Sequence, residues 1–186
     1  NKFSDAGYQI YIVGGAVRDL LMGRGSLPAG RQVKDWDFTT DAKPEEILKL
    51  FPEGFYDNKF GTVGIVARGG GERGAPNSTA AKRGHLFGAA SRQDPEPQIF
   101  EITTMRKEGN YKDHRHPTEV GWTNKIEEDL ARRDFTVNAI SMDPDSKLVD
   151  PYDGQQDIKD GIIRSVGDPA KRFQEDALRL IRAIRI

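Results

Sequence analysis

Two aspartates separated by one residue, Asp35 and Asp37, are the side chains in this sequence best suited to hold a metal ion. They lie in the segment Lys34–Thr40, and if this segment is a β-strand, alternation places both carboxylates on one face and Trp36 and Phe38 on the other. Paired carboxylates are hard oxygen ligands for Mg²⁺, which binds one or two carboxylates together with phosphate oxygens of a substrate. The alternative for the same pattern is an exposed acidic edge backed by a buried tryptophan.

A third acidic residue, Glu101, lies in the predicted strand Ile99–Thr104. Alternation along that strand puts the Glu101 carboxylate on the face opposite its apolar residues. If the two strands are neighbours in one sheet, Glu101 therefore stands beside Asp35 and Asp37.

A pair of glycines, Gly14 and Gly15, follows a segment of β-forming residues, Tyr8–Val13. The residues after the pair have helical periodicity as far as Gly23, which is placed to end the helix. Glycines between a strand and a helix let backbone N–H groups approach an anion closely, and the helix dipole favours negative charge there. The pair therefore indicates a phosphate-binding turn or, alternatively, an ordinary tight turn.

Two longer helices are predicted in the second half of the chain, over Ile126–Ile140 and over Pro169–Ile186. In the first, Asp134 and Asn138 are neighbours at i,i+4 spacing. The adjacent residues Arg132 and Arg133 would point about 100° apart. The alternative for this helix is a surface helix with weak ion pairs. The second helix has an apolar stripe and no C-cap, so we expect the chain to be a fragment.

The remaining stretches lack periodicity or are rich in turn residues. The segment 67–98 is rich in Gly, Ala, Ser and Arg and is predicted to be a long disordered insertion. The segment 25–33 is predicted to be a loop, 105–120 a mobile basic loop, and 141–154 a domain junction. Between them a helix is predicted over 41–51 and a strand over 60–66.

Composition excludes several classes of protein. With 186 residues the chain is long enough for one domain and the start of another. The absence of cysteine excludes a disulfide scaffold and thiolate metal sites, and fits a reducing cytoplasm. No apolar run approaches the ~20 residues that cross a bilayer, and no signal peptide is visible. A net charge of -1 gives no electrostatic case for nucleic acid, so any basic surface is local.

Taken in order, these residues resemble the class II tRNA nucleotidyltransferases (CCA-adding enzymes) and the related bacterial poly(A) polymerases. The blocks that carry the resemblance are Gly14–Leu21, Asp35–Thr40, Phe60–Thr62, Glu101–Arg106, Arg115–Pro117, Asp129–Ala139 and Arg172–Arg179. They span nearly the whole chain. The sequence departs from the family in a longer loop at 25–33 and in the segment 67–98, which interrupts a normally short hairpin connection.

The resemblance implies an α+β fold: a polymerase-β-like catalytic head with a mixed sheet and flanking helices over 1–150, then the start of a helical neck over 151–186. It implies addition of CMP and AMP from CTP and ATP to the tRNA 3′ end by phosphoryl transfer with two Mg²⁺ ions. By resemblance, the metals are assigned to Asp35 and Asp37, with Glu101 as a third candidate. The nucleotide is assigned to Gly14, Gly15, Arg18, Arg132, Arg133, Asp134, Asn138, Asp176 and Arg179.

The chemistry of the bases supports the last two assignments. Cytosine and adenine present an amino donor beside a ring-nitrogen acceptor, whereas uracil and guanine present a carbonyl beside a ring N–H. A carboxylate and a guanidinium at i,i+3 spacing, Asp176 and Arg179, match only the first pattern. The alternative is an ordinary surface salt bridge.

Other functions stay open at this point. A poly(A) polymerase would share every catalytic residue, although Ala177 is more similar to the tRNA enzymes, where the polymerases tend to carry proline. An enzyme that adds only CC or only A, a small-molecule nucleotidyltransferase and an inactive binding module are further alternatives. The oligomeric state is left open by the sequence.

Overall fold

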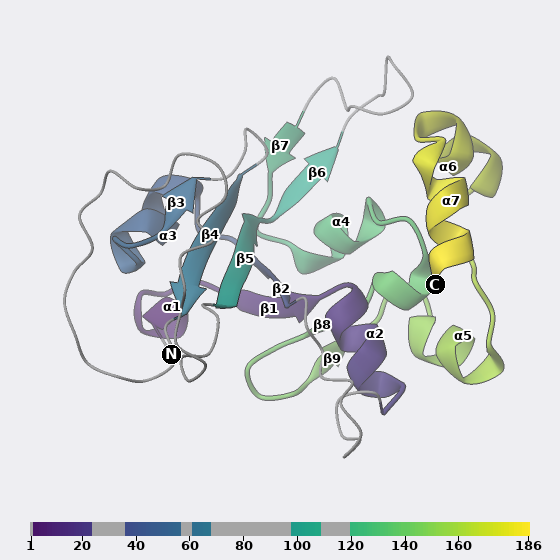
Figure 1. Ribbon diagram of the computed structural model, residues 1–186, viewed down its shortest axis with the longest axis horizontal. Helices are drawn as coiled ribbons and strands as arrows, with labels where there is room; N and C mark the ends of the chain where they lie inside the picture. Colours follow the sequence, from purple (N-terminus) through teal and green to yellow (C-terminus); the bar gives the residue numbers. More distant parts are fainter. Residues whose placement is uncertain (1, 24–35, 57–60, 68–97, 109–119) are drawn as a thin grey trace, which may run out of the picture.

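The centre of the molecule is a mixed β-sheet (Figure 1). The computed structural model describes residues 2–23, 36–56, 61–67, 98–108 and 120–186. In spatial order its strands are β3 (Phe55–Tyr56), β4 (Thr62–Ala67), β5 (Gln98–Thr104), β2 (Asp37–Thr40), β1 (Ile10–Val13), β8 (Ser141–Met142) and β9 (Leu148–Val149). Strands β2 and β5 are parallel, and the other neighbours are antiparallel. A separate hairpin pairs β6 (Arg106–Glu108) with β7 (Val120–Trp122).

Helices pack around this sheet. They are α1 (Lys2–Asp5), α2 (Gly15–Leu21), α3 (Pro44–Leu50), α4 (Ile126–Ala131), the 3-10 turn η1 (Thr136–Asn138), α5 (Gly154–Asp160), α6 (Pro169–Glu175) and α7 (Leu178–Arg185). Figure 1 shows α1 and α3 near β3 and β4, whereas α5, α6 and α7 gather at the opposite end of the molecule. Among the described residues, none of the helices combines the length and apolar composition that a membrane span requires.

Strand alternation gives the sheet one apolar face. Phe38, Val63 and Ile102 are neighbours in the strand register and belong to one core cluster. The α1 and α3 residues Phe3 and Ile47 are buried in the same cluster. Because side chains alternate along a strand, the residues between them, including the acidic ones, point to the other face. The predicted strand alternation at Asp37 and Phe38 is thus confirmed.

A second core cluster lies under α4. It contains Val13 from β1, Met105, Leu130 from α4, Ala139 and Val166. Met105, Leu130 and Ala139 are fully buried. This cluster joins α4 and the segments that follow it to the sheet next to the β1–α2 turn.

The predicted helix over Ile126–Ile140 is wrong beyond Ala131. After that residue the chain extends at Phe135, which forms a β-bridge with Ser165, and only then makes the short η1 turn. The Asp134 carboxylate accepts a hydrogen bond from the Phe135 N–H at 2.8 Å, so the side chain replaces the carbonyl that a helix would have supplied.

The predicted continuous helix over Pro169–Ile186 is also wrong, because α6 ends at Glu175 and α7 starts at Leu178. Asp176 has an extended backbone, with φ −148° and ψ 106°. Its carboxylate accepts a hydrogen bond from the Leu178 N–H at 2.9 Å and so begins a new helix.

The predicted loop over 105–120 and the predicted domain junction over 141–154 both contain strands. Residues at both ends of the 105–120 segment form the β6–β7 hairpin, and the turn-rich segment 141–154 forms the β8–β9 hairpin, which extends the main sheet. Predictions for 25–33, for the interior of the 67–98 segment and for Asp35 lie outside the described residues.

Candidate functional site

The turn between β1 and α2 lies at the centre of the candidate site, next to Arg133 and Asp37. Gly14 has φ 73° and ψ −140°, a conformation that glycine adopts and other residues rarely do. A Cβ atom at Gly14 would lie 3.0 Å from Arg133 Nη1 and 3.6 Å from Asp37 Oδ2. The structure therefore brings together a backbone turn, a guanidinium and a carboxylate that come from three distant parts of the sequence.

Two acidic side chains stand on neighbouring strands at this place. Asp37 in β2 is paired in register with Glu101 in the parallel strand β5, so the condition for Glu101 to stand beside Asp37 is met. Both residues are exposed, on the face opposite Phe38. They supply hard oxygen donors on one face, a set that suits Mg²⁺ when a substrate provides further oxygens. Within the described part of the chain, no group of three potential ligands is arranged around one point.

A buried carboxylate holds the two adjacent arginines. Asp129 Oδ1 accepts hydrogen bonds from Arg132 Nε at 3.0 Å and Nη2 at 2.9 Å, and Asp129 Oδ2 lies 3.4 Å from Arg133 Nη2. The Arg106 N–H donates to the same carboxylate at 3.1 Å. Burial raises the pKa of Asp129, but the charges of both arginines and the hydrogen bonds outweigh it and leave that pKa below its usual value.

Arg132 and Arg133 are buried to the same extent, with 17% of each side chain exposed, but Arg133 has fewer of its donors satisfied. Burial lowers the pKa of Arg133, and the charges of Asp129 and Asp37 oppose part of that effect. Its Nε is buried without a hydrogen-bond partner in the described structure. Positive charge is thus held between Asp129 and the Gly14 turn, where it can meet an anion.

A chain of polar contacts links α2 to α7. Arg18 Nη1 donates to Asn138 Oδ1 at 2.8 Å, and Asn138 Nδ2 donates to Asp134 Oδ1 at 3.2 Å. Asp134 Oδ2 accepts from Arg182 Nε at 2.7 Å. The predicted contact between Asp134 and Asn138 therefore exists, although the two residues do not share a helix. Gly15 lies under the Arg18 guanidinium, which is 3.4 Å from where a Cβ would be.

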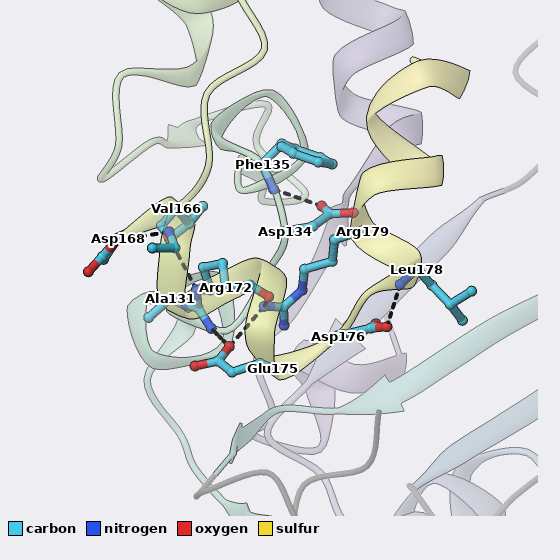
Figure 2. Close-up of polar contacts among 11 residues, drawn as sticks. Ala131, Asp134, Phe135, Val166, Asp168, Arg172, Glu175, Asp176, Leu178 and Arg179 are labelled. Carbon is cyan, nitrogen blue, oxygen red and sulfur yellow. Dashed lines mark hydrogen bonds and ion pairs between the residues drawn. The ribbon is translucent and has the colours of Figure 1, made fainter. Parts of the chain in front are cut away.

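The structure separates the contacts of Asp176 and Arg179, which were predicted to share one helical face. Figure 2 shows the Asp176 carboxylate directed to the Leu178 N–H. The buried Arg179 side chain instead donates through Nη1 to Glu175 Oε2 at 2.8 Å and to the Arg172 carbonyl at 2.9 Å. The break between α6 and α7 is the cause, since Asp176 lies in the break and Arg179 lies in α7.

Sequence reasoning missed three residues that organise the site: Asp129, Glu175 and Arg172. Two of them carry a signal in their spacing, because Asp129 precedes its arginines by three and four positions, and Glu175 stands three after Arg172 and four before Arg179. Burial raises the pKa of Glu175, but the hydrogen bonds from Arg179 and Arg172 outweigh it and lower that pKa overall.

The chain is similar to proteins of known family and structure. Residues 10–70 and 75–164 match the poly A polymerase head domain. The chain is 42% identical over 182 residues to a CCA-adding enzyme of Lactobacillus helveticus, a match that covers 97% of this chain and 37% of that enzyme. Among solved structures it is similar to the Bacillus stearothermophilus CCA-adding enzyme in complex with CTP, with a TM-score of 0.72 and 36% identity over 99% of this chain and 36% of that chain.

A second solved structure is a tRNA nucleotidyltransferase complexed with a primer tRNA and an incoming ATP analog, with a TM-score of 0.59, 25% identity and coverage of 98% of this chain and 42% of that chain. These likenesses confirm the predicted mixed sheet with flanking helices. The chain spans between 36% and 42% of the length of the three relatives.

Proposed function

Because the chain belongs to the poly A polymerase head-domain family, we propose that it is the catalytic head of a cytoplasmic nucleotidyltransferase that adds CMP and AMP from CTP and ATP to the 3′ end of tRNA without a template. Residues 1–150 form the head in this proposal, and 151–186 begin a helical neck. The similarity to CCA-adding enzymes supports the activity and its substrates.

The observation that carries the proposal is the convergence of Gly14, Arg133 and Asp37. A triphosphate needs a close backbone approach and fixed positive charge, and phosphoryl transfer needs carboxylates beside the reacting phosphate. The Gly14 turn supplies the close backbone approach and Arg133 supplies the positive charge. Asp37 supplies the carboxylate, with its Oδ2 at 3.6 Å from where a Cβ at Gly14 would be.

The family normally uses divalent metal ions, and we propose Mg²⁺ held by Asp35 and Asp37, with Glu101 as a third ligand. When bound, two such ions would activate the RNA 3′-hydroxyl and neutralise charge on the pyrophosphate leaving group. The exposed carboxylates of Asp37 and Glu101 on one sheet face fit this role.

The other residues bind and orient the nucleotide. Gly14, Gly15 and Arg18 face the triphosphate in this proposal. The ribose and phosphates are held by Arg132, Arg133, Asp134 and Asn138. Asp129 keeps the two adjacent arginines apart and directed, so the cations need little reorganisation when the nucleotide arrives.

Asp176 and Arg179 read the base in this proposal. A carboxylate can accept several hydrogen bonds, so the bond from the Leu178 N–H leaves acceptor capacity on Asp176 for an amino group of cytosine or adenine. The same carboxylate disfavours the carbonyls of uracil and guanine. Selectivity of this kind is enforced by the cost of a buried polar group left without its partner.

The direct experiment incubates the full-length protein with tRNA that lacks its 3′ end and with each radiolabelled nucleoside triphosphate. We expect two CMP residues and one AMP to be added, and Asp37→Ala to abolish transfer. Asp160→Ala, an exposed carboxylate at the end of α5, is the control and should keep full activity. Runs of AMP alone would identify a poly(A) polymerase, addition of only CC or only A a split enzyme, and no transfer to RNA would refute the proposal.

A further inference from the structure

The Arg172 side chain in α6 connects three segments of the chain. Its Nε donates to the Val166 carbonyl at 2.8 Å, its Nη1 donates to Glu175 Oε2 at 3.1 Å, and its Nη2 donates to the Ala131 carbonyl. The guanidinium is largely buried, with 17% of the side chain exposed. Figure 2 shows it between the last residue of α4 and the end of α6.

The backbone of the same residue supports the proposed base-reading pair. The Arg172 carbonyl accepts hydrogen bonds from Arg179 Nη1 at 2.9 Å and from the Asp176 N–H at 3.3 Å. Glu175 Oε2 accepts from both Arg172 and Arg179, so the two guanidiniums share one carboxylate oxygen. A displacement of Arg172 would therefore also shift Asp176 and Arg179, the two base-reading residues.

On its other side Arg172 contacts the start of the phosphate-binding segment. Ala131, whose carbonyl it binds, directly precedes Arg132 and Arg133. The base-reading residues Asp176 and Arg179 lie beyond the end of α6, far in sequence from this segment at the end of α4. The Arg172 guanidinium is thus a direct polar connection between them.

We propose that Arg172 is a positioning residue that sets the distance between the base-reading pair and the phosphate-binding arginines, and so determines how strictly the enzyme distinguishes CTP from UTP. This inference rests on the proposed function. Arg172 does not itself contact the nucleotide. An arginine is required because its planar group donates in three fixed directions, which the single ammonium of lysine cannot reproduce.

The test replaces Arg172 by lysine in the full-length protein and measures kcat/KM for CTP and UTP on tRNA that lacks its 3′ end. The matched control is Arg164→Lys, which breaks another guanidinium–carboxylate bridge, to the buried Asp157, outside the proposed site. We expect Arg172→Lys to reduce the preference for CTP over UTP by about tenfold or more, because a polar site that loses its alignment loses discrimination. Arg164→Lys should lower thermal stability and leave the preference unchanged.

The outcomes separate the two proposals. If the wild type does not transfer CMP to tRNA, the proposed function fails and this inference fails with it. If the wild type transfers CMP selectively and Arg172→Lys, folded by circular dichroism, keeps the wild-type preference, only the positioning role is refuted. Should the lysine variant not fold, Arg172→Gln at a temperature below its unfolding transition serves the same comparison.

Discussion

The absence of a side chain at Gly14 is as important to the site as the groups around it, because it leaves room for the Arg133 guanidinium. We expect Gly14→Ala to abolish nucleotide transfer, because the new Cβ would press against Arg133 Nη1 at 3.0 Å and displace the guanidinium from the turn. A non-glycine residue at this positive φ should also cost about 1–3 kcal/mol of folding free energy. Transfer assays and thermal unfolding of the variant measure the two effects.

Gly7→Ala is the matched control for that substitution. Gly7 also has a positive φ, of 83°, but a Cβ there would have no neighbour within 4 Å. It should show a similar loss of stability with full activity. Equal loss of activity in both variants would mean that backbone strain, and not the displaced guanidinium, explains the Gly14 result.

Asp129 makes stability depend on pH. Its pKa is depressed in the folded state, so its contribution is fully present above the unfolded pKa of about 3.9 and is lost as the pH falls through the folded pKa. Asp129→Asn should therefore destabilise the protein by about 3–5 kcal/mol at pH 7, since two buried arginines lose their counter-charge. The difference from wild type should shrink as the pH falls from 4 towards 3 in urea unfolding experiments.

An exposed carboxylate provides the comparison for this pH dependence. The Asp160 carboxylate accepts hydrogen bonds from Gln156 Nε2 and lies on the surface of α5. Asp160→Asn should change the unfolding free energy by no more than about 0.5 kcal/mol at either pH. A constant difference between Asp129→Asn and wild type from pH 7 to pH 3 would contradict the assigned role of the Asp129 charge.

At the scale of elements, strand alternation predicts which sheet face carries the acidic residues. The points at which α4 and α6 end could not be predicted from the sequence. The pairing of β2 with β5 is a finding of the structure, but the polar strand faces that carry Asp37 and Glu101 could be predicted from the period-two pattern. The ends of α4 and α6 could not, because Phe135 pairs with Ser165 and the Arg172 side chain reaches the Ala131 carbonyl. Such tertiary contacts override local propensity and leave no periodic signal.

Helix α5 depends on one close approach between backbones. A Cβ at Gly154 would lie 2.2 Å from the Thr136 carbonyl oxygen, which belongs to η1. We expect Gly154→Ala to lower the unfolding free energy by about 2–4 kcal/mol, because either α5 or η1 must move. Chemical denaturation of the variant measures this loss.

Gly161→Ala tests whether any glycine of α5 would behave in the same way. Gly161 follows the helix with a φ of 66°, and a Cβ there would meet nothing within 4 Å. The expected cost is only that of the backbone conformation, about 1–2 kcal/mol. If Gly154→Ala costs no more than Gly161→Ala, the approach of α5 to η1 is not tight in solution.

For the molecule as a whole, the segment between β4 and β5 is expected to be dispensable. Ala67 and Gln98 are paired opposite each other in the antiparallel register, so a short turn can connect them. Replacing residues 68–97 by a glycine-containing turn should preserve transfer activity and raise stability by about 1–2 kcal/mol through a smaller loop. Limited proteolysis should cut the wild-type chain within this segment first, and resistance there would contradict its prediction as disordered.

The parallel pairing of β2 with β5 also bears on how the protein folds. It joins residues 64 positions apart, while β4 and β5 pair as the two arms of a hairpin and β1 and β2 are closer in sequence. Contacts between distant residues form only after a long loop has closed, and closing that loop costs conformational entropy. Asp37 and Glu101 therefore meet only once that loop has closed, and a nascent chain has no paired acidic residues at this place until β5 has been synthesised.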